Sequence, residues 1–272
     1  MVKRKITSEN NVKIIARPPS KAIEREFASA LKKMIDEMNE RFNNQVFKKL
    51  NKSTIEKFSD AQIGNFGKIL LTLANKVKRK LLRQFNNDRI DSMIDNIYGR
   101  INTFNKKTFY GQIEDEIGIS AKELIATEGL SPNINALIIE TQQWVKKLRD
   151  DNLEYFTNTI LRGMAEGKNL DQIKSDFSKS TSNRKGNAEM VARTQVNTFN
   201  SLNNKIRAQN LGITEGIWVT SGDERVRKSH KERDGKIFKL SEGLYSSLDG
   251  KTLYPSVFYN CRCSTKFIIP TD

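Results

Sequence analysis

The chain contains very little cysteine and histidine. Its 272 residues include two cysteines, Cys261 and Cys263, and one histidine, His230. Two cysteines one residue apart do not make a disulfide framework. On a strand they would share a face but lie farther apart than disulfide geometry allows. This usage is typical of a protein of a reducing cytoplasm.

Long apolar runs are also missing. No stretch is apolar enough to span a bilayer, and the N-terminal residues lack the apolar region of a signal peptide. We therefore expect neither a membrane-embedded chain nor secretion by a signal peptide. The chain has no Walker glycine loop, no G-x-S-x-G motif and no Rossmann fingerprint, so nothing in it supports nucleotide hydrolysis or acyl transfer.

Acidic residues are in deficit. The 47 Lys and Arg residues exceed the 32 Asp and Glu residues, which gives a net charge of +15. A surplus of this size favours a polyanionic neighbour, with nucleic acid as the first candidate. The densest basic patch is a candidate non-specific contact with the DNA backbone. Its alternative interpretation is the solvated face of a bundle helix. The patch consists of Lys76, Lys78, Arg79, Lys80 and Arg83.

Most of the chain has a helical pattern. Apolar residues make up 37% of it, which favours an elongated helical body with much exposed surface. Residues 1–19 are expected to form an extended arm that ends in Pro18-Pro19. The pattern loosens between residues 109 and 130, and residues 178–187 are expected to form a polar loop. Apolar spacings of three and four predict helices over about 20–46, 63–82, 88–104, 132–167, 169–177 and 188–210.

The pattern changes after Gly212. Short strands are expected at residues 213–219, 256–258 and 264–269, with a charged helix or loop at 225–233. The predicted fold class is mainly α with a small C-terminal α+β module. The predicted division is an arm over 1–19, a helical body over 20–187 and the module over 188–272.

The module contains the scarce metal-binding residue types. Two thiolates on one turn and an imidazole from another segment would give three zinc ligands, namely Cys261, Cys263 and His230. Asp223 or Asp234 could supply the fourth. The alternative is that both cysteines are small buried apolar residues and that His230 hydrogen-bonds a turn. Zn²⁺ is thus the one cofactor that the sequence suggests.

The charged residues around His230 allow two interpretations. One is a metal-dependent nuclease or other DNA-processing enzyme centred on His230. The other is a salt-bridged network in which Asp223 accepts from Arg225 or Arg227 and stabilises a module with a thin core. No second histidine exists to strengthen the nuclease interpretation.

Three motifs in the same region carry a family resemblance. The first is Ala192-Arg193-Thr194-Gln195, and the last is Asn260-Cys261-Arg262-Cys263. Together they resemble the phage Mu F-like minor head proteins, also called phage head morphogenesis proteins, over about residues 188–268. The sequence departs from the family at Gln195, where glutamate is usual, and before Asn260, where the glycine-rich approach is missing. The middle motif contains Trp218, Asp223, Arg225, Val226, Arg227, His230 and Asp234-Gly235.

The resemblance implies a virion component rather than an enzyme. It implies a minor capsid protein inside the head, near the portal vertex, acting in procapsid assembly, DNA packaging or DNA ejection. The implied partners are the portal protein, other head proteins and packaged DNA, with the host cytoplasm as the place of assembly. Some relatives carry ADP-ribosyltransferase or toxin domains after the module, and none is expected here. The structural network that we assign to the module is Arg193, Trp218, Asp223, Arg225, Arg227, His230, Asp234 and Asn260.

Overall fold

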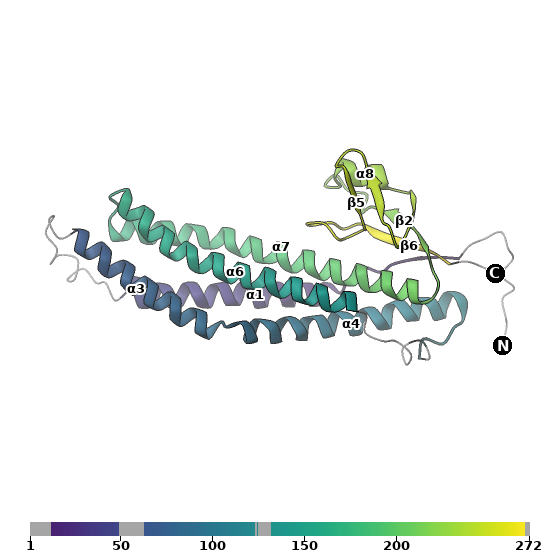
Figure 1. Cartoon of the computed structure of the whole chain (residues 1–272), viewed down its shortest axis with the longest axis horizontal. Coiled ribbons are helices and arrows are strands. Elements are labelled where there is room, and N and C mark those ends of the chain that lie inside the picture. Colours follow the sequence, from purple (N-terminus) through teal and green to yellow (C-terminus); the bar gives the residue numbers. More distant parts are fainter. Residues whose placement is uncertain (1–11, 49–62, 123, 125–131, 270–272) are drawn as a thin grey trace. The chain divides into compact units, whose positions relative to one another are not determined.

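A computed structural model describes residues 12–48, 63–122, 124 and 132–269. The described chain is mostly helical with short strands near its C-terminal end, which confirms the predicted fold class (Figure 1). It forms two compact units. We call residues 1–25, 95–139 and 193–272 the sheet unit, and residues 26–94 and 140–192 the helical unit. No helix in the described ranges has the length and apolarity needed to cross a membrane.

The helical unit is built on amphipathic helices. Its elements are the π-helical turn η1 (Asn43–Phe47), α3 (Ile63–Gln84), and parts of α1 (Lys21–Phe42), α4 (Asn87–Ile117), α6 (Pro132–Ala165) and α7 (Leu170–Asn210). Apolar residues three and four apart face its core. Aromatic rings fill one region of that core, where the Phe42 ring centroid lies 4.3 Å from that of Phe156 and 5.4 Å from that of Phe177.

The sheet unit contains a four-stranded antiparallel sheet. Its strands are β1 (Val12–Ile15), β2 (Glu215–Val219), β3 (Ile237–Lys239) and β6 (Ser264–Ile269), in the order β1-β6-β2-β3. A separate hairpin pairs β4 (Leu244–Ser246) with β5 (Lys251–Leu253), and α8 (Lys228–Arg233) precedes β3. The core combines the sheet with the last turns of α4 and α7. It includes Phe109, Tyr110, Ile113, Ala208, Trp218, Phe238, Cys261, Cys263 and Phe267.

Alternation along the strands places the core side chains. On β2, Gly216 and Trp218 are buried, and on β6 Thr265 and Phe267 face the same interior. Gly216 pairs with Phe267, and a Cβ atom at Gly216 would lie 2.5 Å from Thr265 Cγ2. The position therefore favours glycine, because the side chains of Thr265 and Leu240 occupy the space that a Cβ atom would need.

The N-terminal arm is partly a strand. Val12 to Ile15 pair with β6, and the backbone N–H of Ala16 donates to Thr265 O at 2.9 Å. Asn200 on α7 donates to Arg17 O at 2.9 Å. The described part of the arm is therefore hydrogen-bonded to the sheet unit itself.

Two helices are longer than their patterns predict. The helix expected over 88–104 continues as α4 to Ile117 and ends where Gly118 adopts a φ of 74°. The loop expected at 178–187 is wrong, because α7 is continuous from Leu170 to Asn210. That polar segment contains no proline, and buried side chains before and after it hold the helix in register. The predicted domain boundary at 187 and 188 lies inside α7.

The strand expected at 256–258 is also wrong. Ser256 has a φ of 66°, and this left-handed conformation ends any extended run. The β4–β5 hairpin was not anticipated, since its three-residue strands are too short to show an alternating pattern. The predicted strands at 213–219 and 264–269 are confirmed as β2 and β6, and the glycine stop after α7 is Gly212 with a φ of 76°.

Candidate functional site

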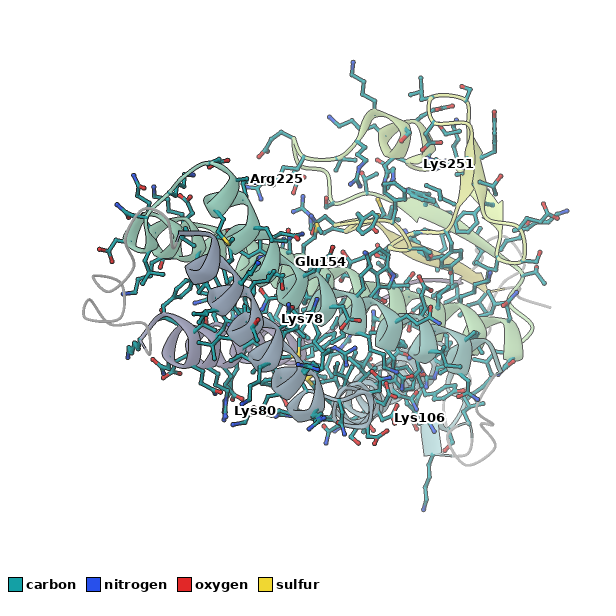
Figure 2. The ribbon with its side chains drawn as sticks, turned by 60° about the vertical axis from the view of Figure 1, so that its left-hand side comes forward. Lys78, Lys80, Lys106, Glu154, Arg225 and Lys251 are labelled. Atoms are coloured by element: carbon teal, nitrogen blue, oxygen red, sulfur yellow. The ribbon has the colours of Figure 1, made fainter. Side chains whose placement is uncertain are left out.

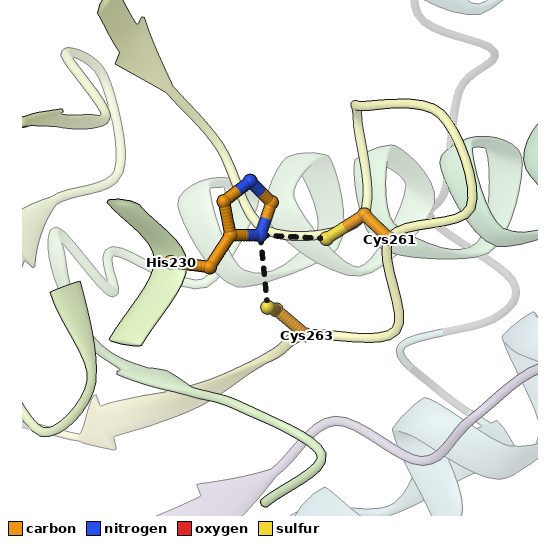
Figure 3. A group of neighbouring side chains, drawn as sticks. All are labelled: His230, Cys261 and Cys263. Atoms are coloured by element: carbon orange, nitrogen blue, oxygen red, sulfur yellow. Dashed lines mark hydrogen bonds between the residues drawn. The ribbon is translucent and has the colours of Figure 1, made fainter. Parts of the chain in front are cut away.

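Three of the predicted metal ligands come together in the sheet unit. His230 lies on α8, while Cys261 and Cys263 lie on the turn before β6. The imidazole Nδ1 is 3.5 Å from Cys261 Sγ and 3.4 Å from Cys263 Sγ, and both sulfurs lie on the same side of the ring (Figure 3). All three side chains are buried. No other Cys, His, Asp or Glu of the described ranges joins this group.

The two nitrogen–sulfur separations are close to those around a tetrahedral zinc ion. Zinc binds sulfur at about 2.3 Å and imidazole nitrogen at about 2.0–2.1 Å, so tetrahedral angles separate the nitrogen from each sulfur by about 3.6 Å. The two observed separations are 3.4 and 3.5 Å. The same atoms could take up zinc with little movement. The same separations are those of hydrogen bonds between the two thiols and the imidazole, so the zinc-ligand set stays a prediction.

The two thiols have unequal acidities. A hydrogen bond from Cys263, together with the neighbouring His230, holds the pKa of Cys261 well below that of a free thiol, although burial opposes this shift. The proximity of Cys261 and burial both raise the pKa of Cys263. One sulfur is therefore favoured as thiolate while the other keeps its proton. A cation with affinity for sulfur would displace that proton.

Hydroxyl groups of α7 hold the segment that leads to the cysteines. Thr198 Oγ1 donates to Ser256 O at 3.0 Å, and Ser201 Oγ donates to Pro255 O at 2.6 Å. Thr194 Oγ1 accepts from the backbone N–H of Asn260 at 3.3 Å. The spacings of four and three residues place the three hydroxyls on one helix face. Sequence reasoning missed this face, although its periodicity was visible.

A buried arginine fixes α8 and the adjacent hairpin. Arg233 has a side-chain exposure of 0% and forms two 3.0 Å hydrogen bonds to the carboxylate of Asp249. It also donates to the carbonyl oxygens of Ser229, Leu244 and Lys251. Its guanidinium carbon lies 5.4 Å from the centroid of the Trp218 ring. This guanidinium joins three segments, yet the sequence gives no signal that separates it from the surrounding basic residues.

The predicted acidic ligands have other partners. Asp223 pairs with Arg262, with Nη1 at 2.6 Å from Oδ2, and accepts the backbone N–H of Arg225 at 3.1 Å. The guanidinium that binds Asp223 is therefore that of Arg262, where sequence reasoning named Arg225 or Arg227. Asp234 Oδ1 accepts the backbone N–H of Thr220 at 2.8 Å and closes the turn after β2. Neither aspartate belongs to the His230 group.

Partial desolvation and the Arg262 guanidinium act on Asp223 in opposite directions. Desolvation raises the pKa of Asp223, whereas the hydrogen bond and charge of Arg262 lower it, and the net effect is a pKa below the ordinary value. Two other residues of the predicted network have separate contacts. Trp218 lies edge-on to His230, with ring centroids 5.5 Å apart, and Arg193 Nε donates to Glu24 at 3.3 Å.

The predicted DNA contact forms an exposed stripe on α3. Lys76, Arg79, Lys80 and Arg83 are exposed, while Lys78 is half-buried on another face of the helix. Figure 2 labels Lys78 and Lys80 on this helix. Positions 76, 79, 80 and 83 share one face because they differ by three, four and seven residues. Within the described ranges none of these four cations forms an ion pair. We call these four residues the α3 stripe.

Part of this chain is similar to a known protein family. Residues 154–266 match the family described as Phage Mu protein F like protein. This segment is therefore similar to a Phage Mu F-like domain. The match begins earlier than residue 188 and includes the end of α6, all of α7 and the sheet-unit segments up to β6. The Phage Mu F-like domain supports the prediction of a phage head morphogenesis protein.

Three curated relatives are longer than this chain. An uncharacterized protein of Haemophilus influenzae is 27% identical over 229 residues, which cover 80% of this chain and 49% of the relative. The NAD(+)–arginine ADP-ribosyltransferase EFV of Enterococcus faecalis is 30% identical over 128 residues, which cover 44% of this chain and 26% of the relative. An uncharacterized protein of Methanocaldococcus jannaschii is 30% identical over 41% of this chain and 17% of its own length. This chain thus spans about half of the first relative and less of the others. No solved structure matches it.

Proposed function

We propose that this protein is a minor capsid protein of a tailed phage, associated with the portal vertex inside the head. There it acts in procapsid assembly, DNA packaging or DNA ejection. The observation that carries the proposal is the Phage Mu F-like domain over residues 154–266. The family points to a structural protein rather than an enzyme. Its expected partners are the portal protein and other head proteins.

The charge of the chain supports a place beside packaged DNA. A net charge of +15 attracts a polyanion without reading its sequence. The α3 stripe offers four exposed cations with no carboxylate partner in the described ranges. Such a surface binds DNA phosphates through counterion release, so the interaction weakens steeply with salt.

Co-purification with assembling heads tests the main proposal. The tagged chain is expressed with the neighbouring head genes, and procapsids are isolated on a density gradient. The expected result is stable, substoichiometric association that depends on the portal gene. Equal recovery from particles assembled without portal protein would contradict portal association, and complete absence from particles would contradict the minor-head proposal.

We also propose that the N-terminal arm and the first helix, α1, make the portal contact, because an extended arm followed by an amphipathic helix suits docking into a groove. A deletion of the whole segment is not a clean test of this contact. Deleting residues 1–50 would also remove β1 from the sheet, so loss of binding would not identify a docking surface. Substitutions at exposed positions of α1, such as Arg25→Glu, leave β1 in place. Portal binding that survives every such substitution would contradict the docking proposal.

We also propose that His230, Cys261 and Cys263 bind Zn²⁺ through three protein ligands. The support is the convergence of two sulfurs on one imidazole nitrogen at 3.4 and 3.5 Å. The ion would join α8 to the turn before β6 and stabilise the sheet unit. Metal analysis of protein purified without chelator should give one zinc per chain, and Cys261→Ser should lower this content. A metal-free wild type that folds normally would contradict the proposal.

The geometry favours this structural role over the alternative of a nuclease. His230 is 3% exposed, and its Nδ1 faces two sulfurs. It is not placed to activate a water for attack on a phosphodiester. A plasmid-nicking assay with Mg²⁺, Mn²⁺ or Zn²⁺ separates the two. Cleavage by the wild type that disappears in His230→Ala, with the variant still folded, would support the nuclease.

A further inference from the structure

Four distant segments bring cationic side chains around one pocket of the sheet unit. The pocket has a volume of about 490 Å³. Five of its seven lining residues are cations, and Glu24 is the one carboxylate in its lining. We call it the arginine pocket. It is lined by Lys21 and Glu24 of α1, Arg193 of α7, Arg225 and Arg227 before α8, and Asn260 and Arg262 of the turn before β6.

Each of three arginines is held at one side of its guanidinium. Arg227 Nη2 donates to Tyr259 O at 2.7 Å, and its guanidinium carbon lies 4.9 Å from the centroid of the Phe258 ring. Arg262 is held by Asp223, and Arg193 is held by Glu24 through Nε. These contacts fix where the charged groups lie. A ligand would therefore meet positioned donors and not freely moving side chains.

The contacts leave donors available. Arg193 uses Nε and Arg227 uses Nη2, so among the described residues their other guanidinium N–H groups have no hydrogen-bond partner. The side chain of Arg225 is 77% exposed, and its nearest acidic contact is Glu224 at 3.8 Å. Gathering five cations is unfavourable unless anions compensate them. Glu24 and Asp223 compensate only part of this charge.

We propose that the arginine pocket binds a phosphate group. Guanidinium groups present paired N–H donors in a planar fork that matches phosphate oxygens, and this bonding is stronger than that between neutral groups. The phosphate has two sources of the same chemistry, the backbone of DNA and free inorganic phosphate. The assignment goes beyond the proposed function, because it describes a binding site that would exist whether or not the protein meets a portal.

A neighbouring cavity favours a phosphate that is attached to a sugar. Lys21 and Arg262 also line a second cavity of about 310 Å³ in the same unit. Its other lining residues include Asn197, whose buried Nδ2 has no partner in the described part of the chain. An amide beside a cationic pocket suits the oxygen atoms of a sugar next to a phosphate. This arrangement gives the DNA backbone as the favoured source.

Calorimetric titration of the full chain with inorganic phosphate, at constant ionic strength, tests the site. The test variants are Arg225→Gln and Arg193→Gln, and the control is Lys231→Gln, which removes one exposed charge of the same unit outside the pocket. Loss of one charge-assisted hydrogen bond should weaken phosphate binding about tenfold or more in each test variant. The control should bind like the wild type. Arg225→Lys, which keeps the charge but loses the fork, should fall between them.

The same titration in the presence of a short DNA duplex separates the two sources. If the duplex competes with phosphate and pocket variants weaken duplex binding, the DNA backbone is the ligand. If the duplex does not compete, the site is one for free phosphate. No phosphate binding by the wild type, or an equal loss in Lys231→Gln, would overturn the proposal. Thermal unfolding without phosphate checks that each variant is folded.

Discussion

The α3 stripe and the arginine pocket are both basic, but they are built differently. The stripe comes from one helix, and its four cations are exposed and lack ion pairs with described residues. The arginine pocket gathers residues from four segments and holds three of its guanidiniums with a carbonyl or a carboxylate. The stripe therefore needs only a helix, whereas the pocket needs the complete fold of its unit.

This difference separates two ways of binding an anion. Mobile exposed cations attract any polyanion, and their effect decreases as salt screens them. Positioned guanidiniums select the geometry of one phosphate group and depend less on screening because the contacts are short. We expect the stripe to contribute affinity for DNA and the pocket to contribute a fixed point of attachment.

The largest expected effect comes from the proposed metal ligands. Cys263→Ser should abolish zinc binding and destabilise the sheet unit by several kcal/mol, since structural zinc sites contribute on the order of 10 kcal/mol. Asn260 and Arg262 of the arginine pocket alternate with the two cysteines, so loss of the metal should also displace these two residues. The pocket should then lose phosphate affinity, while the α3 stripe keeps its salt-dependent binding of DNA. Zinc content, thermal unfolding and both binding assays measure this. A variant that loses both kinds of binding equally, while still folded, would contradict the separation.

The second prediction compares the buried Arg233 with an exposed cation of the α3 stripe. Arg233→Met should destabilise the protein by about 3–5 kcal/mol, because it removes the buried guanidinium that donates to the Asp249 carboxylate and to three carbonyl groups. Arg79→Gln removes an exposed cation of the stripe and should change stability by less than about 0.5 kcal/mol. Urea unfolding of both variants provides the comparison. A loss below about 1 kcal/mol in Arg233→Met would show that the hairpin does not depend on this guanidinium.

The sequence predicts the helices well where their apolar faces are regular. The pattern of Leu70, Val77 and Leu81 was enough to place α3, and the stripe on its exposed face follows from the same pattern. Prediction from apolar periodicity fails at residues 178–187, where a polar segment without an apolar face is still helical because α7 continues through it. Helix continuity there is decided by the neighbouring turns and not by local composition.

Much of the candidate site was also predictable. The scarcity of histidine and cysteine marked His230, Cys261 and Cys263 as a group, and the structure brings them together. The partners of charged residues were not predictable, because the many arginines of the module are alike in sequence. Only the fold distinguishes Arg233, which is buried, from Arg225, which is exposed.

Neutralising the stripe should have a moderate effect on DNA binding alone. The variant Lys76→Gln, Arg79→Gln, Lys80→Gln, Arg83→Gln should lower the slope of log affinity against log salt by about 3–4 if all four cations contact phosphates. Phosphate binding at the arginine pocket should not change. Fluorescence anisotropy with a labelled duplex at several salt concentrations measures the slope. An unchanged slope would remove the stripe from the DNA interface.

Acid pH should have the smallest effect, which is a change in the stability of the sheet unit through the Arg233–Asp249 pair. The Arg233 hydrogen bonds hold the pKa of Asp249 well below its usual range, although burial opposes this. A carboxyl group with a depressed folded pKa contributes stability above its unfolded pKa of about 3.9, and this stability is lost as pH falls through the lower folded pKa. Stability from this pair should therefore be constant from neutral pH to about pH 5 and decrease below about pH 4. Asp249→Asn should be less stable at neutral pH and lose less stability on acidification. Because the α3 stripe forms no ion pair with described residues, its quadruple variant should lose stability with acid in the same way as the wild type. Urea unfolding midpoints of the wild type, Asp249→Asn and the quadruple variant across this pH range provide the measurement.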